Sequence, residues 1–195
     1  MIQLHISKGN SKIGGVPSVS FPPHVTCAPG VPCFKLCYAY RLSRIRKSVQ
    51  AAWQRNLDLW NEDKRGFERQ LTVFLETTPS RYFRWFVAGD IPDAGFLRLM
   101  IRTAKKFPAI KFMVYTKWWR KSNRRLIIAD LPNLVVRLST WPNSLWEKPL
   151  SGWPFSAMIP KGADILPGSI ECPGECGPCG YKCWDRDVNV SIRQH

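Results

Sequence analysis

The chain has 195 residues, of which 45% are hydrophobic and 12% aromatic, and its 29 Lys and Arg residues against 14 Asp and Glu give a formal charge of +15. This composition excludes a disordered chain, and the length suits one domain with its own core over residues 1–195. No apolar run approaches the roughly 20 residues of a membrane-spanning helix, and the first residues lack the apolar core of a signal peptide, so we expect a cytoplasmic protein.

The first part of the chain predicts one short strand and two amphipathic helices. The strand is expected at residues 18–21, because Pro22 and Pro23 cannot continue a β-ladder. Apolar residues recur at helical spacing over residues 43–60, which predicts the first helix. The second helix is expected from about residue 64 to residue 77, ending before Pro79.

Strands and helices then alternate. The aromatic and β-branched run at residues 82–87 predicts a buried strand that ends at the turn Ala88-Gly89-Asp90. Asp90 or Ile91 before Pro92 predicts the start of the next helix. Further strands are expected at residues 111–115 and 134–138, with a helical stretch near residues 121–128 between them. After Thr140 only short strands are expected, at residues 155–159, around Ile165 and at residues 188–192.

This alternation indicates an α/β fold with a mainly parallel sheet. A complete eight-fold barrel usually needs about 250 residues, so a reduced or partial (β/α) barrel fits the length better, with an open doubly wound sheet as the alternative. In either fold the ligand site lies at the carboxyl ends of the strands. Residues 22–37, Gly89-Asp90 and Thr116-Lys117 all fall there.

Three cysteines, spaced Cys27-x5-Cys33-x3-Cys37, lie in a loop rich in proline and glycine. In a reducing cytosol such grouping favours metal over disulfides, and an odd total of 7 cysteines excludes complete pairing within the chain. Three thiolates can hold three irons of a [4Fe-4S] cluster and leave the fourth iron open to a substrate or an exogenous ligand. Buried structural cysteines are the alternative, but three of them do not normally cluster in such a loop.

Four further cysteines form a glycine-rich knuckle within residues 170–185, namely Cys172, Cys176, Cys179 and Cys183. Four thiolates complete a closed shell around tetrahedral zinc or a second [4Fe-4S] cluster, and the spacing does not separate these two metals. A closed shell favours a structural role. In a further alternative, ligands from both cysteine groups are pooled in a single site.

Four segments together carry a resemblance to a known family. They are the loop ending in Cys37-Tyr38-Ala39, the strand ending in Gly89-Asp90, the strand ending in Tyr115-Thr116-Lys117, and the C-terminal knuckle. These segments resemble the phage "gene product 88" family, which is similar to small members of the radical SAM superfamily. The resemblance spans most of the chain, from about residue 12 to residue 195.

The resemblance implies that Cys27, Cys33 and Cys37 ligate a [4Fe-4S] cluster whose open iron chelates S-adenosylmethionine (SAM). It also implies that Gly89 and Asp90 lie where such proteins contact the amino group of SAM. The usual superfamily spacing is C-x3-C-x2-C and its turn is Gly-Gly-Glu, whereas this chain has x5 and x3 spacings and Ala88-Gly89-Asp90. The resemblance therefore supports the cluster more strongly than SAM chemistry.

Other candidate residues carry weaker signals. Asp90 and Lys117 stand at strand ends and are candidate catalytic residues that could bind a substrate amine or carboxylate, with a surface ion pair as the more ordinary alternative. His195 follows the last strand, and His5 and His24 show no ligand spacing.

A basic and aromatic segment is a candidate nucleic-acid platform. It runs from Trp118-Trp119 through Arg120-Lys121 to Arg124 and Arg125. A helix that packs its tryptophans inward explains the same pattern. The charge of +15 suits nucleic acid or other anions, and a solvated basic face is the alternative interpretation.

The sequence thus favours an iron-sulfur protein, a redox or radical-type enzyme acting on SAM or another small molecule. The alternative from another class is a nucleic-acid-binding phage regulator with structural zinc or iron-sulfur knuckles, and a purely electron-carrying protein is a third possibility. We expect no membrane association, and location in the host cytoplasm if the protein is phage-encoded. The substrate and the oligomeric state do not follow from the sequence.

Overall fold

The computed structural model describes residues 2–119, 131–147 and 150–194. Seven strands form a single parallel sheet in the order β1-β2-β3-β4-β5-β7-β6. The strands are β1 Ser18–Val19, β2 Tyr82–Trp85, β3 Lys111–Thr116, β4 Leu134–Thr140, β5 Phe155–Ile159, β6 Ser169–Glu171 and β7 Asn189–Arg193. The sheet is not closed, because β1 and β6 are its two edges.

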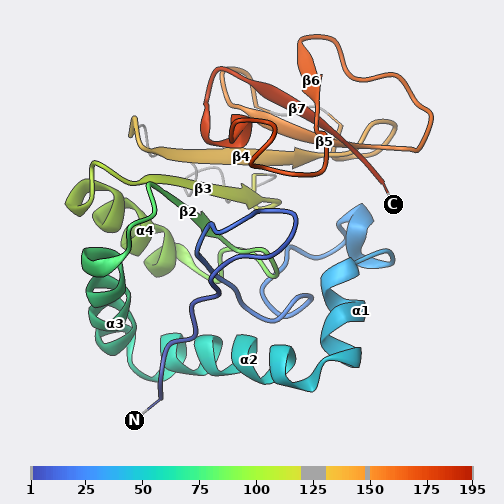
Figure 1. The fold of residues 1–195 in the computed structure, drawn as a ribbon. Coiled ribbons are helices and arrows are strands. Elements are labelled where there is room, and N and C mark those ends of the chain that lie inside the picture. Colours follow the sequence, from blue (N-terminus) through green and yellow to red (C-terminus); the bar gives the residue numbers. More distant parts are fainter. Residues whose placement is uncertain (1, 120–130, 148–149, 195) are drawn as a thin grey trace.

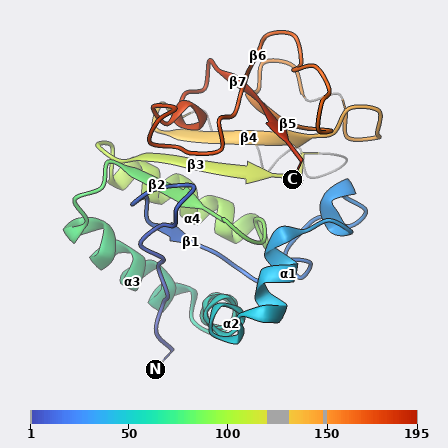
Figure 2. The same ribbon diagram turned by 45° about the vertical axis from the view of Figure 1, so that its right-hand side comes forward.

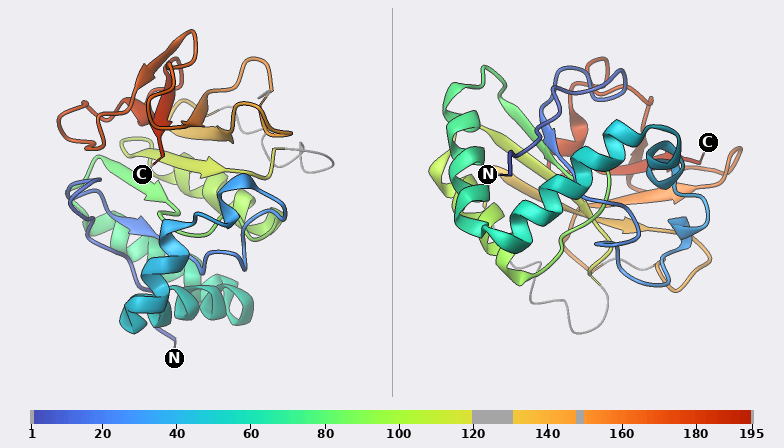
Figure 3. Two further views of the ribbon diagram at one scale, coloured as in Figure 1. Left: turned by 90° about the vertical axis from the view of Figure 1, so that its right-hand side faces the viewer. Right: turned by 90° about the horizontal axis from the view of Figure 1, so that it is seen from below.

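In the described residues four α-helices accompany the sheet, and all four precede β3 in the chain. They are α1 Tyr38–Ile45, α2 Lys47–Glu62, α3 Lys64–Thr77 and α4 Ala94–Lys106. Figure 1 shows them gathered on one side of the sheet, and the view from below in Figure 3 shows α2 and α3 in front of the strands. The C-terminal part of the chain, including a 3-10 helix at Lys182–Trp184, lies on the other side.

Alternation along the strands creates these two faces. Phe83 and Trp85 of β2 pack with the helices, as do Phe112 and Val114 of β3, in the main core. Met113, between the latter two, belongs to a second, smaller cluster with residues of the knuckle. The sheet is therefore covered by helices on one face and by the cysteine knuckle on the other.

The strand order bears on the choice between the two expected architectures. The first five strands lie side by side in their order in the chain, without the reversal that a doubly wound sheet has at its switch point. Helices on both faces, which a doubly wound sheet also needs, are not found in the described residues. The coarse prediction of an α/β fold with a parallel sheet is confirmed.

Several predicted boundaries are confirmed and others are wrong. The helix at residues 64–77 and the strand at residues 155–159 have the predicted bounds, and the strands near residues 18, 82, 111, 134 and 188 are found with ends shifted by a few residues. The helix expected at residues 43–60 is instead two helices, because Arg46 adopts an extended backbone conformation with ψ of 91°. The strand expected around Ile165 is absent, and β6 forms further along. The helical stretch expected near residues 121–128 lies outside the described residues.

The start of α4 is a second correction. Neither Asp90 nor Ile91 caps this helix. Asp93 does so, because its side chain accepts a hydrogen bond from the backbone N–H of Phe96 at 2.8 Å. The carboxylate of Asp90 instead accepts hydrogen bonds at the carboxyl ends of β2 and β3. No helix within the described ranges is long and apolar enough to cross a membrane.

Candidate functional site

The first cysteine group lies in the loop that joins β1 to α1. Figure 2 shows the chain leaving β1 and running across to α1. Cys33 is in a short 3-10 helix at Pro32–Phe34, and Cys37 is the N-cap residue of α1. The Cys37 Sγ accepts a hydrogen bond from the backbone N–H of Tyr40 at 3.4 Å. The Cys37 sulfur therefore faces the first backbone N–H groups of α1.

Gly89 brings the end of β2 against the start of this loop. Its φ of +78° is in the left-handed region, and a Cβ at Gly89 would lie 2.7 Å from Thr26 Oγ1 and 2.8 Å from the carbonyl oxygen of Phe21. The N–H of Asp90 donates to Thr26 Oγ1 at 3.0 Å. Only glycine fits this close approach, so the predicted importance of Gly89 has a steric cause in this structure.

Asp90 and Lys117 form a buried pair at the carboxyl ends of β2 and β3. The Lys117 Nζ lies 3.8 Å from Asp90 Oδ2, and the two side chains are 16% and 0% exposed. The same oxygen accepts the backbone N–H of Lys117 at 2.8 Å, and Oδ1 accepts the N–H of Ile91. The alternative of a surface ion pair is therefore wrong. With its oxygens engaged in this way, Asp90 positions Lys117 and joins the two strand ends.

The positive charge of Lys117 acts on two thiols of the loop. Burial raises the pKa of Cys27 to about 11, opposed by the positive charge of Lys117, and burial raises the pKa of Cys33 against the same opposing charge. Burial alone would lower the pKa of Lys117, but Asp90, Cys27 and Cys33 outweigh it and raise that pKa. Burial also raises the pKa of Asp90 despite Lys117. One buried cation thus lies among two thiols and a carboxyl group.

An aromatic stack organises the same loop and was not predicted. The ring of His24 lies between Phe34, at a centroid distance of 3.7 Å, and Tyr40, at 4.2 Å. His24 has a left-handed φ of 69°, and its Nε2 atom is buried without a hydrogen-bond partner among the described residues. The stack joins the residue after Cys33 to the first turn of α1, so it fixes the spacing between Cys33 and Cys37.

The second cysteine group forms the knuckle over the other face of the sheet. Burial raises the pKa of Cys176 to about 11, opposed by Arg84 and reinforced by the nearby thiols of Cys183, Cys179 and Cys172. Cys176 is therefore close enough to the other three thiols for each of them to affect its pKa. All seven cysteines of the chain are free thiols.

Arg137 ties the knuckle to the centre of the sheet. This fully buried residue of β4 donates hydrogen bonds to carbonyl oxygens of Cys183 at 2.8 Å, Asp185 at 2.6 Å and Phe155 at 3.1 Å. It also donates to those of Lys182 and Val188.

Two further side chains of the sheet face the knuckle thiols. The hydroxyl of Tyr115 donates to Cys183 Sγ at 2.9 Å, and the Arg84 guanidinium stacks over the Tyr115 ring at 5.0 Å. Two guanidinium groups, of Arg84 and Arg137, therefore lie beside the second group of thiols.

The two cysteine groups have different surroundings. The charges of Lys117 and Asp90 affect the pKa values of Cys27 and Cys33 in the first group, whereas the charge of Arg84 affects those of Cys172 and Cys176 in the second. This separation favours three ligands plus four over a pooled site. In residues 2–119, 131–147 and 150–194, no three His, Cys, Asp or Glu side chains are already arranged as a metal-binding group. The cysteines are brought together as neighbours, and a ligand shell is a proposal made below.

The tryptophans expected to form a nucleic-acid platform are turned toward the protein. Trp119 is buried, and its indole N–H donates to the carbonyl oxygen of Ser139 at 2.8 Å. Trp118 donates to the carbonyl oxygen of Thr26 in the cysteine loop at 3.1 Å. Inward packing of Trp119 is therefore confirmed. Arg120, Lys121, Arg124, Arg125 and His195 lie outside the described residues.

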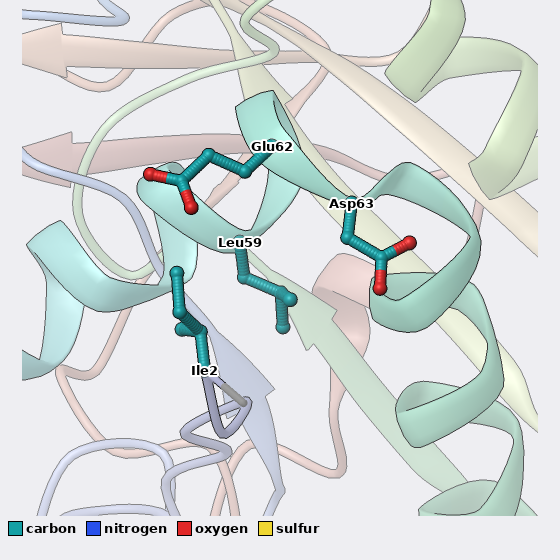
Figure 4. Close-up of a pocket in the computed structure, with 4 residues that line it drawn as sticks. All are labelled: Ile2, Leu59, Glu62 and Asp63. Atoms are coloured by element: carbon teal, nitrogen blue, oxygen red, sulfur yellow. The ribbon is translucent and has the colours of Figure 1, made fainter.

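Two remaining features stand apart from the cysteines. Asn56 Oδ1 accepts the backbone N–H of His5 at 2.7 Å, so the N-terminal segment is held on α2. A hollow of about 460 Å³ is lined by Ile2, Leu59, Glu62 and Asp63 (Figure 4). It includes none of the predicted site residues.

Comparison with known proteins gives one match. A family model described as gene product 88 matches residues 4–144. No curated protein and no solved structure matches the chain, and the resemblance to radical SAM proteins receives no support from these comparisons. The matched segment contains the first cysteine group, Gly89, Asp90 and Lys117, and it ends before the second cysteine group.

Proposed function

The chain belongs to the gene product 88 family of phage proteins, and on this premise we propose that it is an iron-sulfur protein. Cys27, Cys33 and Cys37 hold a [4Fe-4S] cluster with one open iron. The protein acts as a redox or radical-type enzyme on SAM or another small molecule, in the reducing cytoplasm of the host, where thiols stay available for metal.

One observation carries this proposal: the three cysteines occupy a single loop at the carboxyl edge of the sheet, around the charge of Lys117. Cys27 and Cys33 both lie within the electrostatic reach of Lys117, and Cys37 in turn acts on Cys33. The carboxyl edge of a parallel sheet is where α/β proteins bind their ligands. Three soft thiolate donors fit iron-sulfur ligation and leave one iron without a protein ligand.

The residues of the site have distinct tasks in this proposal. A cluster with an open iron supplies one-electron chemistry and a coordination position for a ligand. Lys117 offsets the negative charge that three thiolates bring into a half-buried loop. Asp90 holds Lys117 in place, and Gly89 permits the close contact of β2 with the loop. Placing Gly89 beside the amino group of bound SAM is the finer part of the proposal, and it rests on the resemblance alone.

The four cysteines of the knuckle form a closed structural centre with zinc or a second [4Fe-4S] cluster. Four thiolates around either metal leave a net negative charge, which the buried guanidinium group of Arg137 and that of Arg84 offset. The Tyr115 hydroxyl donates to the sulfur of Cys183, and hydrogen bonds of this kind hold metal-binding sulfurs in position. If the four thiols were neutral and held no metal, they would not offset the positive charges of Arg84 and Arg137.

The architecture proposed for the whole chain is a partial (β/α) barrel of the radical SAM kind. The first five strands lie side by side in their order in the chain, and the helices cover one face of the sheet. Both features support this architecture, because a complete barrel has the same strand order and its helices on the outer face alone. The alternative function is a nucleic-acid-binding phage regulator in which both centres are structural. The formal charge of +15 supports that alternative.

Anaerobic purification followed by quantification of iron, sulfide and zinc tests the proposal. Electron paramagnetic resonance of the reduced protein is then recorded with and without SAM. We expect iron and sulfide for at least one cluster, and a spectrum that SAM changes. Zinc as the sole metal would refute the iron-sulfur proposal. If iron is present, but SAM neither changes the spectrum nor is cleaved under reduction, the proposed radical SAM chemistry is refuted and the proposed iron-sulfur cluster stands.

Substitution of single cysteines assigns the open cluster. Cys27→Ser, Cys33→Ser and Cys37→Ser are each expected to abolish its signal. Retention of the full signal in all three variants would contradict the assignment. The matched control is Cys179→Ser in the knuckle, which leaves the signal of the first cluster in place if the two groups are separate.

A further inference from the structure

The N-terminal part of the chain, which contains the first cysteine loop, has no acidic residue. The first Asp or Glu of the sequence is Asp58. Basic residues gather in the loop, in α1 and at the junction of α1 with α2, and all of them are exposed: Lys35, Arg41, Arg44, Arg46 and Lys47. None of these five pairs with a carboxylate among the described residues. The segment therefore presents positive charge that no neighbour within it offsets.

The same segment exposes large apolar side chains. Leu36 is 60% exposed, Tyr38 61% and Ile45 80%. Most of the exposed large hydrophobic residues in the described part of the chain come from this segment: Val25, Phe34, Leu36, Tyr38, Tyr40 and Ile45. Single exposed apolar residues are ordinary, but a cluster of them with aromatic rings among arginines marks a binding surface.

Tyr38 connects this surface to the first cysteine site. It follows Cys37 directly, and its hydroxyl donates to the carbonyl oxygen of Val87 at 2.7 Å, just before Gly89. Tyr38 also contributes to the raised pKa of Lys117. A ligand lying on α1 and the loop therefore borders the cysteines.

The chemistry of the surface selects one class of ligand. Exposed cations without neighbouring anions suit a polyanion, and rings among the arginines suit the faces of nucleic-acid bases. Bases reach such rings only when they are unstacked, which favours a single strand over a duplex. An acidic protein would satisfy the cations, but only nucleic acid carries a flat ring beside every negative charge, which suits the exposed rings of Phe34, Tyr38 and Tyr40.

We propose that the surface formed by the first cysteine loop and α1, residues 25–47, binds single-stranded nucleic acid. In the iron-sulfur enzyme proposed above, on which this second part rests, SAM or another small molecule then binds the open iron, and single-stranded nucleic acid is the substrate class bound beside it. Phosphates contact the basic side chains of α1, and a base stacks on Tyr38 at the border of the site.

Fluorescence anisotropy with labelled 15-nucleotide oligo(dT) and oligo(U) tests the binding at several salt concentrations. The test variant is the double charge reversal Arg41→Glu with Arg44→Glu on α1. Its matched control is Arg98→Glu with Lys105→Glu, since both residues are exposed on α4. We expect the α1 variant to bind at least about tenfold more weakly, with the salt slope of log K reduced by about 1.4, and the control to bind like the parent.

A second pair of variants tests stacking. Tyr38→Phe keeps the ring and is expected to bind like the parent, whereas Tyr38→Leu keeps an apolar side chain without the ring and is expected to lose about 5- to 100-fold in affinity. Circular dichroism of every variant checks that α1 still folds.

Four outcomes would overturn the inference. They are no binding to either oligonucleotide, equal weakening by the α1 and α4 variants, preference for duplex over single strand, and binding of an acidic polypeptide such as poly-Glu in place of the oligonucleotides. The metal content of the same preparation separates the two proposals. Iron with a SAM-dependent spectrum but no oligonucleotide binding refutes this inference alone. Oligonucleotide binding by a chain without iron refutes the enzyme and its substrate class, and leaves the binding surface.

Discussion

Replacement of Arg137 by Met is expected to release the knuckle from the sheet. The guanidinium group donates to carbonyl oxygens of five residues on β5, the knuckle and the segment before β7. A single hydrogen bond from a charged donor contributes about 1.5–3 kcal/mol. The contributions of these bonds do not simply add, because one guanidinium group makes all of them and is hydrated again when the protein unfolds. Removal of the guanidinium group also leaves buried carbonyl oxygens without a donor, so a total loss of about 3–5 kcal/mol is the appropriate scale. This is a large share of a total stability of about 5–15 kcal/mol.

Urea unfolding measures the change in the free energy of unfolding, and metal analysis with hydrogen exchange shows where the effect lies. We expect hydrogen exchange to rise in residues 172–184, and the metal that we propose for the knuckle to be lost before that of the first cysteine group. The control is Arg102→Met, which removes a bidentate contact to Glu68 from a side chain that is 53% exposed and is expected to cost less than about 1 kcal/mol. If Arg137→Met costs no more than this control and keeps the metal of the knuckle, the anchoring role is refuted.

Three other predictions follow from the geometry. Gly89→Ala should destabilise the protein by more than about 2 kcal/mol and disturb the first cysteine site, since it adds a steric clash to the left-handed backbone. The control is Gly30→Ala, which should cost only about 1–2 kcal/mol, because Gly30 has a φ of +71° but open space around it. Equal losses in the free energy of unfolding for the two variants, measured in urea, would contradict a steric clash at Gly89. Asp93→Ala should lose about 0.5–2 kcal/mol at neutral pH, because it removes the cap of α4. Burial opposes ionisation of Asp93, but its hydrogen bonds and a nearby lysine lower its pKa, so this stability is present above the ordinary carboxyl pKa of about 3.9 and is lost as the pH falls below it. The difference between parent and variant in thermal unfolding should therefore become smaller in strong acid, where the neutral carboxyl group still accepts hydrogen bonds, and a difference that does not change with pH would refute the assignment. If both cysteine groups hold metal as proposed, Cys37→Ser and Cys176→Ser should each remove metal from their own group only, and loss of all metal in either variant would indicate a pooled site.

Local signals predicted the regular elements well where one signal dominated. The helix at residues 64–77 has its predicted ends, because an apolar stripe and Pro79 agree. The break at Arg46 could not be predicted in this way, since the apolar periodicity continues across it. Asp93 carried a usable signal, as an N-cap residue three positions before Phe96, but the proline before it drew the prediction upstream.

The candidate site was predicted in its parts more than in its assembly. Cysteine spacing and strand ends identified both groups and the pair of Asp90 and Lys117. Burial of that pair depends on how the loop covers it, which no local pattern contains. Arg137 was open to detection, since a charge inside an apolar strand needs buried partners, but those partners lie far along the chain.

Arg137 also matters before synthesis of the chain is complete. Its carbonyl partners lie in β5 and beyond, so they are synthesised after it. Until β5 pairs with β4, the half-made sheet ends in an apolar edge strand with open hydrogen-bonding groups. An inward-facing charge on such an edge opposes pairing with a strand of another chain. The side chain that later holds the knuckle is therefore expected to disfavour aggregation of the incomplete chain through the open edge of β4.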